Sequence, residues 1–292
     1  MKLFADTADV KEIKDLLDRG VIDGVTTNPS IIAKAAKDAS VPLNKAFVEN
    51  QIGKIIDAIN ASDPTEDFHL SVEVWSRDPD EILRQAHHLR DTFNYLDLSI
   101  KVQIGWDELR VIRKLKEERF SVNCTCCMTP TQALLAAKAG ADYVSLFVGR
   151  IRDFSCISET ADQAVRLLGV ARKSGDKDLT KDAEEVLKKK QKIMQTQVNY
   201  HLERGIVGVE EIGEGAPFNV IGMTRALLEE MGSKTQIIAG SIRSADDAKK
   251  SGLTGAHIAT VQPKFFREML EHWKTEEVIT QFLGDFKPLL QE

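Results

Sequence analysis

Short runs of apolar residues alternate with amphipathic stretches along most of the chain. The short runs have the length of strands, whereas the stretches between them repeat with the 3.6-residue period of a helix. We expect eight strands, at residues 2–5, 24–27, 70–75, 97–107, 121–127, 143–148, 236–239 and 258–261. Helices are expected at residues 9–19, from 30 onward, 43–60, 79–92, 107–118, from 130 onward, and after each of the last two strands.

Strands separated by helices in this way are typical of parallel β/α units. A chain of 292 residues also has a suitable length for one closed barrel. We therefore predict the α/β class and a (β/α)8 TIM barrel that occupies residues 1–292 as a single domain. An open doubly wound sheet is the alternative, and it is disfavoured because no glycine-rich phosphate-binding motif follows the first strand.

One connection interrupts this alternation. Residues 154–234 contain no convincing strand, and we predict a helical insertion between strands six and seven. Its charged run at residues 179–204 predicts either a solvated helix packed outside the barrel or an arm that binds a partner or covers the active site. The glycine-rich residues 205–215, with Pro217, predict a loop that could belong to a lid.

The composition is that of a globular protein, with 42% hydrophobic and 29% charged residues. A formal net charge of -6 gives no general electrostatic footprint for nucleic acid. No apolar run is long enough to span a bilayer, and the first residues lead directly into a strand rather than a secretion leader. We therefore predict a cytoplasmic protein that binds neither nucleic acid nor membranes.

Four cysteines raise the question of a metal or redox site. Cys124 and Cys127 form a C-x-x-C pair, and Cys126 and Cys156 are the others. Alternation along a strand would point Cys124 and Cys127 to opposite faces, and no second pair follows at the spacing of metal ligands. We expect buried reduced thiols and no metal site.

A lysine lies in the middle of the apolar run DLSIKVQIGWD, at residues 97–107. Alternation places Ile100 and Val102 on one face of this strand, and Lys101 with Gln103 on the other. One interpretation is a lysine whose ammonium group reaches solvent at the end of a long stem. The other is an amine in a dry pocket, where desolvation favours the neutral form that attacks a carbonyl and gives a Schiff base.

Polar residues also mark the carboxyl ends of the other strands, where the chemistry of a TIM barrel takes place. Alone, each has a structural explanation: Asp6 could cap a helix, Thr27 and Asn28 could build a turn, and Glu73 could face solvent. Together with Lys101 they provide what is needed to form an imine, move protons and hold an anionic sugar phosphate. The candidate residues are Asp6, Thr26, Thr27, Asn28, Glu73, Lys101, Gln103, Asn123, Thr125, Ser145, Arg150, Ser241 and Arg243.

Several motifs resemble those of the transaldolase family, including its short branch that is similar to the fructose-6-phosphate aldolases. They are FADTADVKEI, DGVTTNPSIIAK, VEV, IKV, NCTCCMTPTQALLAAKAGADYVSLFVGRI and IIAGSIR. The resemblance covers residues 1–152 and resumes at residue 236. It implies a class I aldolase mechanism on sugar phosphates, with neither a metal nor a cofactor.

The resemblance also implies roles for the candidate residues. Lys101 would form the Schiff base with the ketose carbonyl, and Asp6 would take the C4 hydroxyl proton as the C3–C4 bond breaks. Glu73 and Thr125 would hold the water for carbinolamine dehydration. The remaining positions would bind the dihydroxyacetone portion (Asn28 and Ser145), shape the pocket (Thr26, Thr27 and Asn123) or bind the phosphate (Arg150, Ser241 and Arg243).

Two positions favour transfer over simple aldol cleavage. Glu73 lies where transaldolases have glutamate and the fructose-6-phosphate aldolases have glutamine, and Phe147 lies where those aldolases have tyrosine. Because Phe147 has no proton to offer an enamine, the three-carbon intermediate would wait for an aldehyde acceptor. We predict transfer of a dihydroxyacetone unit from fructose 6-phosphate or sedoheptulose 7-phosphate to an aldose phosphate.

The chain departs from the family pattern beside the lysine. Gln103 replaces the usual proline, and because it shares a face with Lys101, a new amide could enter the pocket. Gln103 and the long insertion at residues 154–234 together motivate a rival hypothesis, an aldolase or transaldolase for a modified ketose such as a sulfonated sugar. A third is an inactive barrel that binds partners through its inserted helix, which the intact catalytic set argues against.

The tail at residues 263–292 is rich in apolar side chains, among them Phe265, Trp273 and Phe282. It could pack on its own barrel. Short members of the family use a similar tail to build ring-like oligomers, which implies a homo-oligomer here as well.

Overall fold

The structure is a computed structural model that describes residues 1–62, 68–153 and 216–287, together with isolated positions between 170 and 185. Its strands are parallel and close into a barrel in which each strand pairs with its neighbour in sequence and the last pairs with the first. This architecture confirms the predicted TIM barrel. The strands are β1 (Lys2–Asp6), β2 (Gly24–Thr26), β3 (His69–Glu73), β4 (Leu98–Gln103), β5 (Ser121–Cys127), β6 (Tyr143–Phe147), β7 (Gln236–Gly240) and β8 (Ile258–Val261).

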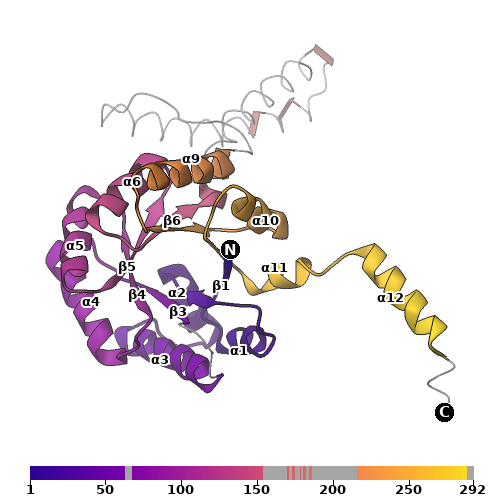
Figure 1. Ribbon diagram of the computed structural model, residues 1–292, viewed down its shortest axis with the longest axis horizontal. Helices are drawn as coiled ribbons and strands as arrows, with labels where there is room; N and C mark the ends of the chain where they lie inside the picture. Colours follow the sequence, from indigo (N-terminus) through magenta and orange to yellow (C-terminus); the bar gives the residue numbers. More distant parts are fainter. Residues whose placement is uncertain are drawn as a thin grey trace.

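Helices surround the barrel on its outer side (Figure 1). Among those described, none has the length and apolar character that a membrane span requires. They are α1 (Val10–Asp18), α2 (Pro29–Asp38), α3 (Lys45–Ala61), α4 (Pro79–Phe93), α5 (Trp106–Glu117), α6 (Pro130–Ala139), α9 (Ala216–Glu230), α10 (Ala245–Leu253), α11 (Pro263–Glu268) and α12 (Trp273–Asp285).

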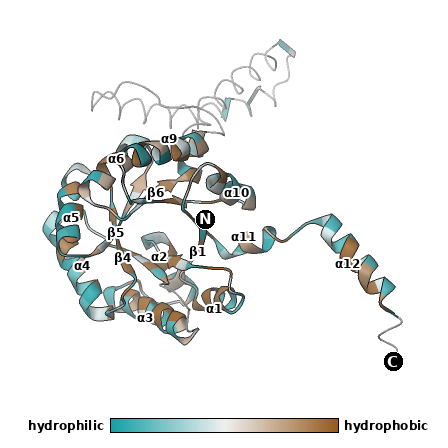
Figure 2. Ribbon diagram, in the orientation of Figure 1, coloured by the Kyte–Doolittle hydropathy of each residue, from teal (hydrophilic) through white to brown (hydrophobic). Residues whose placement is uncertain are grey.

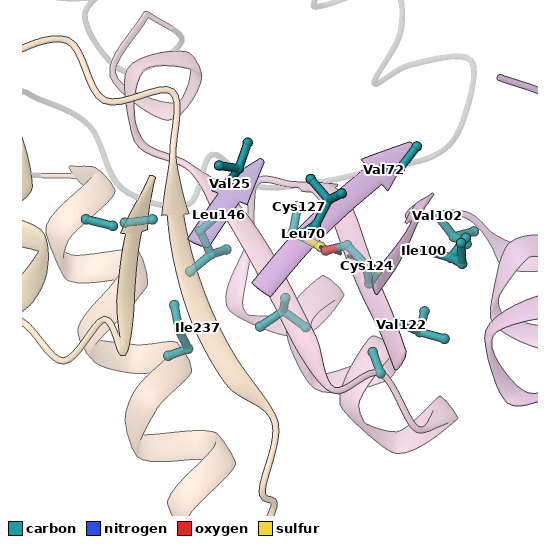
Figure 3. Packing of buried hydrophobic residues seen from close by; sticks show 14 of the residues in the cluster. Val25, Leu70, Val72, Ile100, Val102, Val122, Cys124, Cys127, Leu146 and Ile237 are labelled. Carbon is teal, nitrogen blue, oxygen red and sulfur yellow. Dashed lines mark hydrogen bonds between the residues drawn. The ribbon is translucent and has the colours of Figure 1, made fainter. Parts of the chain in front are cut away.

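The alternation expected around Lys101 is present. Ile100 and Val102 belong to the apolar layer between strands and helices, together with Val72 and Val122 of the adjacent strands (Figure 3). Lys101 therefore points into the barrel. In the parallel register Glu73 pairs with Lys101, and Lys101 with Asn123, so three polar residues of β3, β4 and β5 lie at one level.

A small hydrophobic cluster closes the lower part of the barrel interior. Phe4, Ile238 and Ile258 form this floor, with Tyr143 packed against them. The ring of His69 stacks on Phe4 at a centroid distance of 4.8 Å and meets the ring of Tyr143 edge-on at 4.7 Å. The floor separates the amino ends of the strands from the polar interior at their carboxyl ends.

Two sequence-based boundaries were wrong. β4 ends at Gln103 and not at residue 107, because Gly105 is the N-cap of α5, which begins at Trp106. Pro217 lies in α9 rather than in a loop, since proline is tolerated in the first turn of a helix.

The predicted insertion is described only in part. Its last segment forms α9, which packs against α6 as one of the helices around the barrel. Most of the charged run at residues 179–204, and all of residues 205–215, lie outside the described residues.

The expected orientation of the cysteines was also wrong. Cys124 and Cys127 are both buried in the layer between strands and helices, with their Sγ atoms 3.9 Å apart (Figure 3). The register of β5 against β6 shifts between these two residues, and Cys126 has a φ of 63° in the left-handed region. Such a bulge adds a residue and breaks the alternation.

Three of the four cysteines lie in the described part of the chain. Cys124, Cys126 and Cys127 are free, and Cys156 lies outside the described residues. Within the described part of the chain, no group of histidine, cysteine and carboxylate side chains is arranged to hold a metal ion.

The tail has two different parts. α11 packs on the barrel through the buried Phe265 and Phe266. α12 extends away from the barrel (Figure 1), and none of its residues is buried. Hydrophobic and hydrophilic residues both lie along it (Figure 2), and Trp273 and Phe282 are 73% and 58% exposed. The interpretation that the whole tail packs on its own barrel is therefore wrong for α12.

Candidate active site

Lys101 lies inside the barrel with 5% of its surface exposed. Its Nζ is 2.9 Å from Oε2 of Glu73 and donates a hydrogen bond of 2.8 Å to the carbonyl of Thr27. The structural interpretations that placed Lys101 and Glu73 in solvent were wrong, because a closed barrel has no edge strand. The site therefore contains a largely desolvated amine held against a carboxylate.

Asp6 ends β1 and is half-buried, close enough to this pair for both of their charges to act on it. Asp9, not Asp6, caps α1, since Asp9 accepts from the backbone N–H groups of Lys11 and Glu12. Burial raises the pKa of Asp6; the positive charge of Lys101 and a hydrogen bond act to lower it, and the charge of Glu73 adds to the increase. A carboxyl group in this environment takes up a proton more readily than an ordinary aspartate.

Two threonines orient the Asp6 carboxylate. Thr26 Oγ1 donates to Oδ1 of Asp6 at 2.9 Å, and Thr260 Oγ1 on β8 lies 2.5 Å from Thr26 Oγ1. Because the Thr26 proton is directed to Asp6, the Thr260 hydroxyl is the donor in the second contact. One oxygen of Asp6 is thus fixed by two successive hydrogen bonds.

Polar side chains of β3, β5 and β6 are joined on the other side of the lysine. Ser145 Oγ donates to Oδ1 of Asn123 at 2.7 Å, and Asn123 Nδ2 donates to Ser71 Oγ at 3.0 Å. Ser71 Oγ lies 2.5 Å from Nε2 of His69. The predicted Asn123 and Ser145 therefore meet, and they connect to two residues that sequence reasoning did not include.

Thr125 has a different environment. It is fully buried, and its Oγ1 has no hydrogen-bond partner among the described residues. A buried hydroxyl that forms no hydrogen bond costs free energy, so this group is well suited to bind a water molecule or a ligand.

Three predicted binding residues use their side chains to hold the backbone. Thr27 Oγ1 donates to the carbonyl of Ser71 at 3.1 Å. Asn28 Oδ1 accepts from the N–H of Ile31 at 3.0 Å and caps α2. Gln103 Nε2 donates to the carbonyl of Ser76 at 2.5 Å, so the amide that was expected to enter the pocket is held by the loop after β3.

The predicted phosphate residues lie on the segments that follow β6 and β7. The N–H of Gly149 donates to the carbonyl of Ser241 at 3.1 Å. A Cβ at Gly149 would lie 2.5 Å from Nε of Arg243 and 2.6 Å from that carbonyl, so glycine is required for this close approach. Arg150, next to Gly149, is exposed. The segments thus bring Arg150, Ser241 and Arg243 to one part of the rim.

Arg243 is already paired in this structure. Its two terminal nitrogens donate to the two carboxylate oxygens of Asp153 at 2.5 and 2.6 Å. The hydrogen bond from Arg243 lowers the pKa of Asp153. A phosphate that binds Arg243 must therefore compete with this carboxylate.

Two hollows reach the site from outside the barrel. One of about 380 Å³, with largely apolar walls, lies between α2, α3 and α4 and extends to Glu73. The other, of about 700 Å³, lies beside α1 and α2 and extends to Asp6. Lys101 lines neither hollow, so both approach the catalytic candidates from the side.

Sequence reasoning did not include four of the residues that shape this site. Ser71 lies two positions before Glu73, and Thr260 two positions after Ile258, so alternation along the strands provided a signal for both. His69 begins β3 one residue before the predicted strand. Asp153 lies in the helical residues 148–153 directly after β6, and no local pattern indicates its contact with Arg243.

The sequence matches the model of the transaldolase/fructose-6-phosphate aldolase family over residues 3–291. A probable transaldolase from Dinoroseobacter shibae is 29% identical over 287 residues, which cover 98% of this chain and 97% of that protein. A probable transaldolase from Chelativorans sp. is 30% identical over 286 residues, with 98% and 96% covered. One from Thermoplasma volcanium is 30% identical over 290 residues, again with 98% and 96% covered.

Proposed function

Because the chain belongs to the transaldolase/fructose-6-phosphate aldolase family, and is an enzyme of that class, we propose that it transfers a dihydroxyacetone unit between sugar phosphates through a Schiff base on Lys101. One observation supports this most directly. Lys101 is a buried amine whose Nζ lies 2.9 Å from a carboxylate, at the end of the barrel where the other candidate residues meet.

The reaction begins when the ammonium group of Lys101 gives a proton to Glu73. The free amine attacks the ketose carbonyl and forms a carbinolamine, which loses water to give an iminium ion. Glu73 and the hydroxyl of Thr125 hold the water that carries protons in this step. The unpartnered Oγ1 of Thr125 supports this role.

Cleavage then uses the iminium ion as an electron sink. Asp6 takes the proton of the C4 hydroxyl, the C3–C4 bond breaks, and its electron pair forms an enamine on Lys101 while the aldose leaves. An acceptor aldehyde reverses these steps. The enamine carbon attacks it, Asp6 returns the proton to the new hydroxyl, and water hydrolyses the Schiff base. The raised pKa of Asp6 suits a group that both takes and returns a proton.

Asn28 and Ser145 bind the hydroxyl groups of the dihydroxyacetone portion in this proposal, and Thr26, Thr27 and Asn123 shape the pocket. Arg150, Ser241 and Arg243 bind the phosphate, for which Arg243 must exchange Asp153 for the ligand. This competition favours ligands with a doubly charged end group, since a weaker anion would not displace the carboxylate.

Phe147 supports transfer over release of free dihydroxyacetone. Its ring lies 3.5 Å from the position of a Cβ on Gly240, at the end of β6. The ring has no proton with which to quench the enamine. Gln103 and the long insertion were the two reasons to consider a modified ketose, and the hydrogen bond from the Gln103 amide to Ser76 weakens the first of them. Fructose 6-phosphate and sedoheptulose 7-phosphate are therefore the donors that we propose.

Borohydride trapping tests the proposal. Protein incubated with fructose 6-phosphate and reduced should carry a dihydroxyacetone adduct on the peptide that contains Lys101, identified by mass spectrometry. Lys101→Met should carry no adduct, and Lys11→Met, which replaces an exposed lysine, should be labelled like the wild type. Folded wild-type protein that forms no adduct with fructose 6-phosphate, sedoheptulose 7-phosphate or free dihydroxyacetone would contradict the mechanism.

We also propose that a second copy of the chain covers the apolar side chains of α12, which have no partner in the barrel of their own chain. Trp273 and Phe282 on α12, with Leu270 before it and Phe286 directly after it, are all exposed, and neighbouring exposed apolar side chains of this kind mark interaction surfaces. Light scattering should give a mass above that of one chain for the wild type. Phe282→Glu should lower that mass, and Gln281→Glu, at an exposed polar position of the same helix, should leave it unchanged.

A further inference from the structure

A row of hydrogen-bonded side chains crosses the barrel interior from its hydrophobic floor to the proposed substrate site. It consists of His69 and Ser71 on β3, Asn123 on β5 and Ser145 on β6. Ser71 and Asn123 are fully buried, and His69 and Ser145 are 7% and 4% exposed. The row therefore joins His69, on the hydrophobic floor, to Ser145 in the middle of β6, where substrate is proposed to bind.

The hydrogen positions along the row follow from what each group can donate. Ser145 gives its hydroxyl proton to Oδ1 of Asn123, and the Asn123 amide gives a proton to Ser71 Oγ. In the Nδ1–H tautomer of His69, Nε2 accepts the Ser71 hydroxyl proton across 2.5 Å. This order requires that Nε2 of His69 be an acceptor, which holds only for the neutral imidazole.

The surroundings of His69 meet that requirement. Its ring stacks on Phe4 and touches the edge of Tyr143, so it is enclosed by aromatic side chains. Burial, followed by the positive charges of Lys2 and Lys101, lowers the pKa of His69 to about 3. His69 is thus neutral at any pH at which an enzyme of this kind works, and a neutral ring can accept the Ser71 proton at Nε2.

We propose that His69 is a positioning residue: through Ser71 it fixes the amide of Asn123, and so holds the Ser145 hydroxyl with its lone pairs facing the substrate. The inference rests on the proposed function. It fixes the direction of the proposed contact with the ligand, because a Ser145 hydroxyl that donates to Asn123 can only accept from a further group. The substrate atom that meets Ser145 must therefore be a hydroxyl and not a carbonyl oxygen.

Substitutions on β3 test the row, and a substitution on its neighbour β4 serves as the control. Ser71→Ala breaks the row, and His69→Phe removes the acceptor while keeping an aromatic ring on the floor. Ser99→Ala is the control, because Ser99 pairs in register with Ser71 and is equally buried, yet its Oγ has no hydrogen-bond partner among the described residues. His69→Gln restores an acceptor and should rescue the row.

The test is a double-mutant cycle with Ser145→Ala, using kcat and KM for fructose 6-phosphate. Ser71→Ala and His69→Phe should each raise KM by about tenfold with a smaller change in kcat, since a buried hydrogen bond is lost. Ser99→Ala should match the wild type, and His69→Gln should stay within about threefold of it. In the Ser145→Ala background, His69→Phe and Ser71→Ala should each change KM by less than about twofold.

Two results would overturn the inference in different ways. If Ser71→Ala lowers activity by the same factor with and without the Ser145 hydroxyl, the effect of Ser71 does not pass through Ser145, and His69 does not position Ser145. If the wild type forms no borohydride adduct with any of the three donors, the proposed function fails and the inference fails with it. Should His69→Phe not fold, the cycles of Ser71→Ala and His69→Gln decide the question.

Discussion

Replacement of Glu73 tests how much the buried ammonium group of Lys101 destabilises the folded state once its carboxylate partner is lost. The side chains of Lys101 and Glu73 are 6% and 13% exposed, and 2.9 Å separates Nζ from Oε2. Glu73→Ala leaves the ammonium group of Lys101 inside the barrel, where the carbonyl of Thr27 is its remaining hydrogen-bond acceptor among the described residues. A buried charge without its counter-charge is far more costly than an exposed one.

The expected loss is large on the scale of the stability of a domain. Removing one partner of a buried ion pair lowers the free energy of unfolding by about 3–5 kcal/mol. Glu73→Gln keeps an oxygen that accepts from Nζ, so its cost should be roughly half as large. The double variant Lys101→Met/Glu73→Gln contains no buried charge at these positions, and it should be as stable as the wild type within about 1 kcal/mol, or more stable, although inactive.

Urea unfolding followed by far-ultraviolet circular dichroism at neutral pH measures these free energies of unfolding. Asp15→Ala is the control, because it breaks an ion pair with Arg19 that lies in solvent, and it should leave the free energy unchanged within error. A loss below about 1 kcal/mol for Glu73→Ala would refute the reasoning, since it would mean that water reaches Lys101.

Three further predictions concern single side chains. Burial raises the pKa of Asp6 above 3.8, so the folded state becomes less stable as the pH rises from 3.8 through the raised value. In urea titrations Asp6→Asn should therefore be more stable than the wild type at neutral pH and should lose this advantage below pH 3.8, and the variant should be inactive. His69 makes stability depend on pH in the opposite direction, because its pKa is about 3 in the folded chain against 6.5 in the unfolded chain. The wild type therefore loses stability as the pH falls below 6.5, and acid unfolding followed by circular dichroism should occur at a lower pH for His69→Gln. Phe147→Tyr should increase the release of free dihydroxyacetone from fructose 6-phosphate in the absence of an acceptor, because a phenol can give the enamine a proton; enzymatic reduction of the product measures this release. An unchanged ratio of release to transfer would contradict the role of this position.

The sequence alone determined the alternation of strands and helices, and with it the barrel. Ile100 and Val102 against Lys101 illustrate why: side chains alternate along any strand, so the buried face is fixed by local covalent geometry. Parallel strands then direct their carboxyl ends to one side of the barrel, which is why polar residues as distant in sequence as Asp6 and Arg243 were expected at one end.

Local geometry failed where the strand was irregular or the partner was distant. The bulge at Cys126 placed Cys124 and Cys127 on one side, because one residue added to a strand reverses the alternation. Likewise, nothing near Gln103 in the sequence indicates that its amide binds the carbonyl of Ser76, on the loop after another strand.

The partners of the site residues were decided only by the tertiary structure. The sequence identified Lys101, Glu73 and Asp6 as candidates, but the closed barrel and its register decided that Lys101 pairs with Glu73. They also decided that Thr260 contacts Thr26, which donates to Asp6. In the same way, they connected His69 to Ser145 through Ser71 and Asn123. Each of these contacts joins residues on different strands. The distance between two strands depends on how the whole sheet closes, and this is a property of the packed chain that no short segment contains.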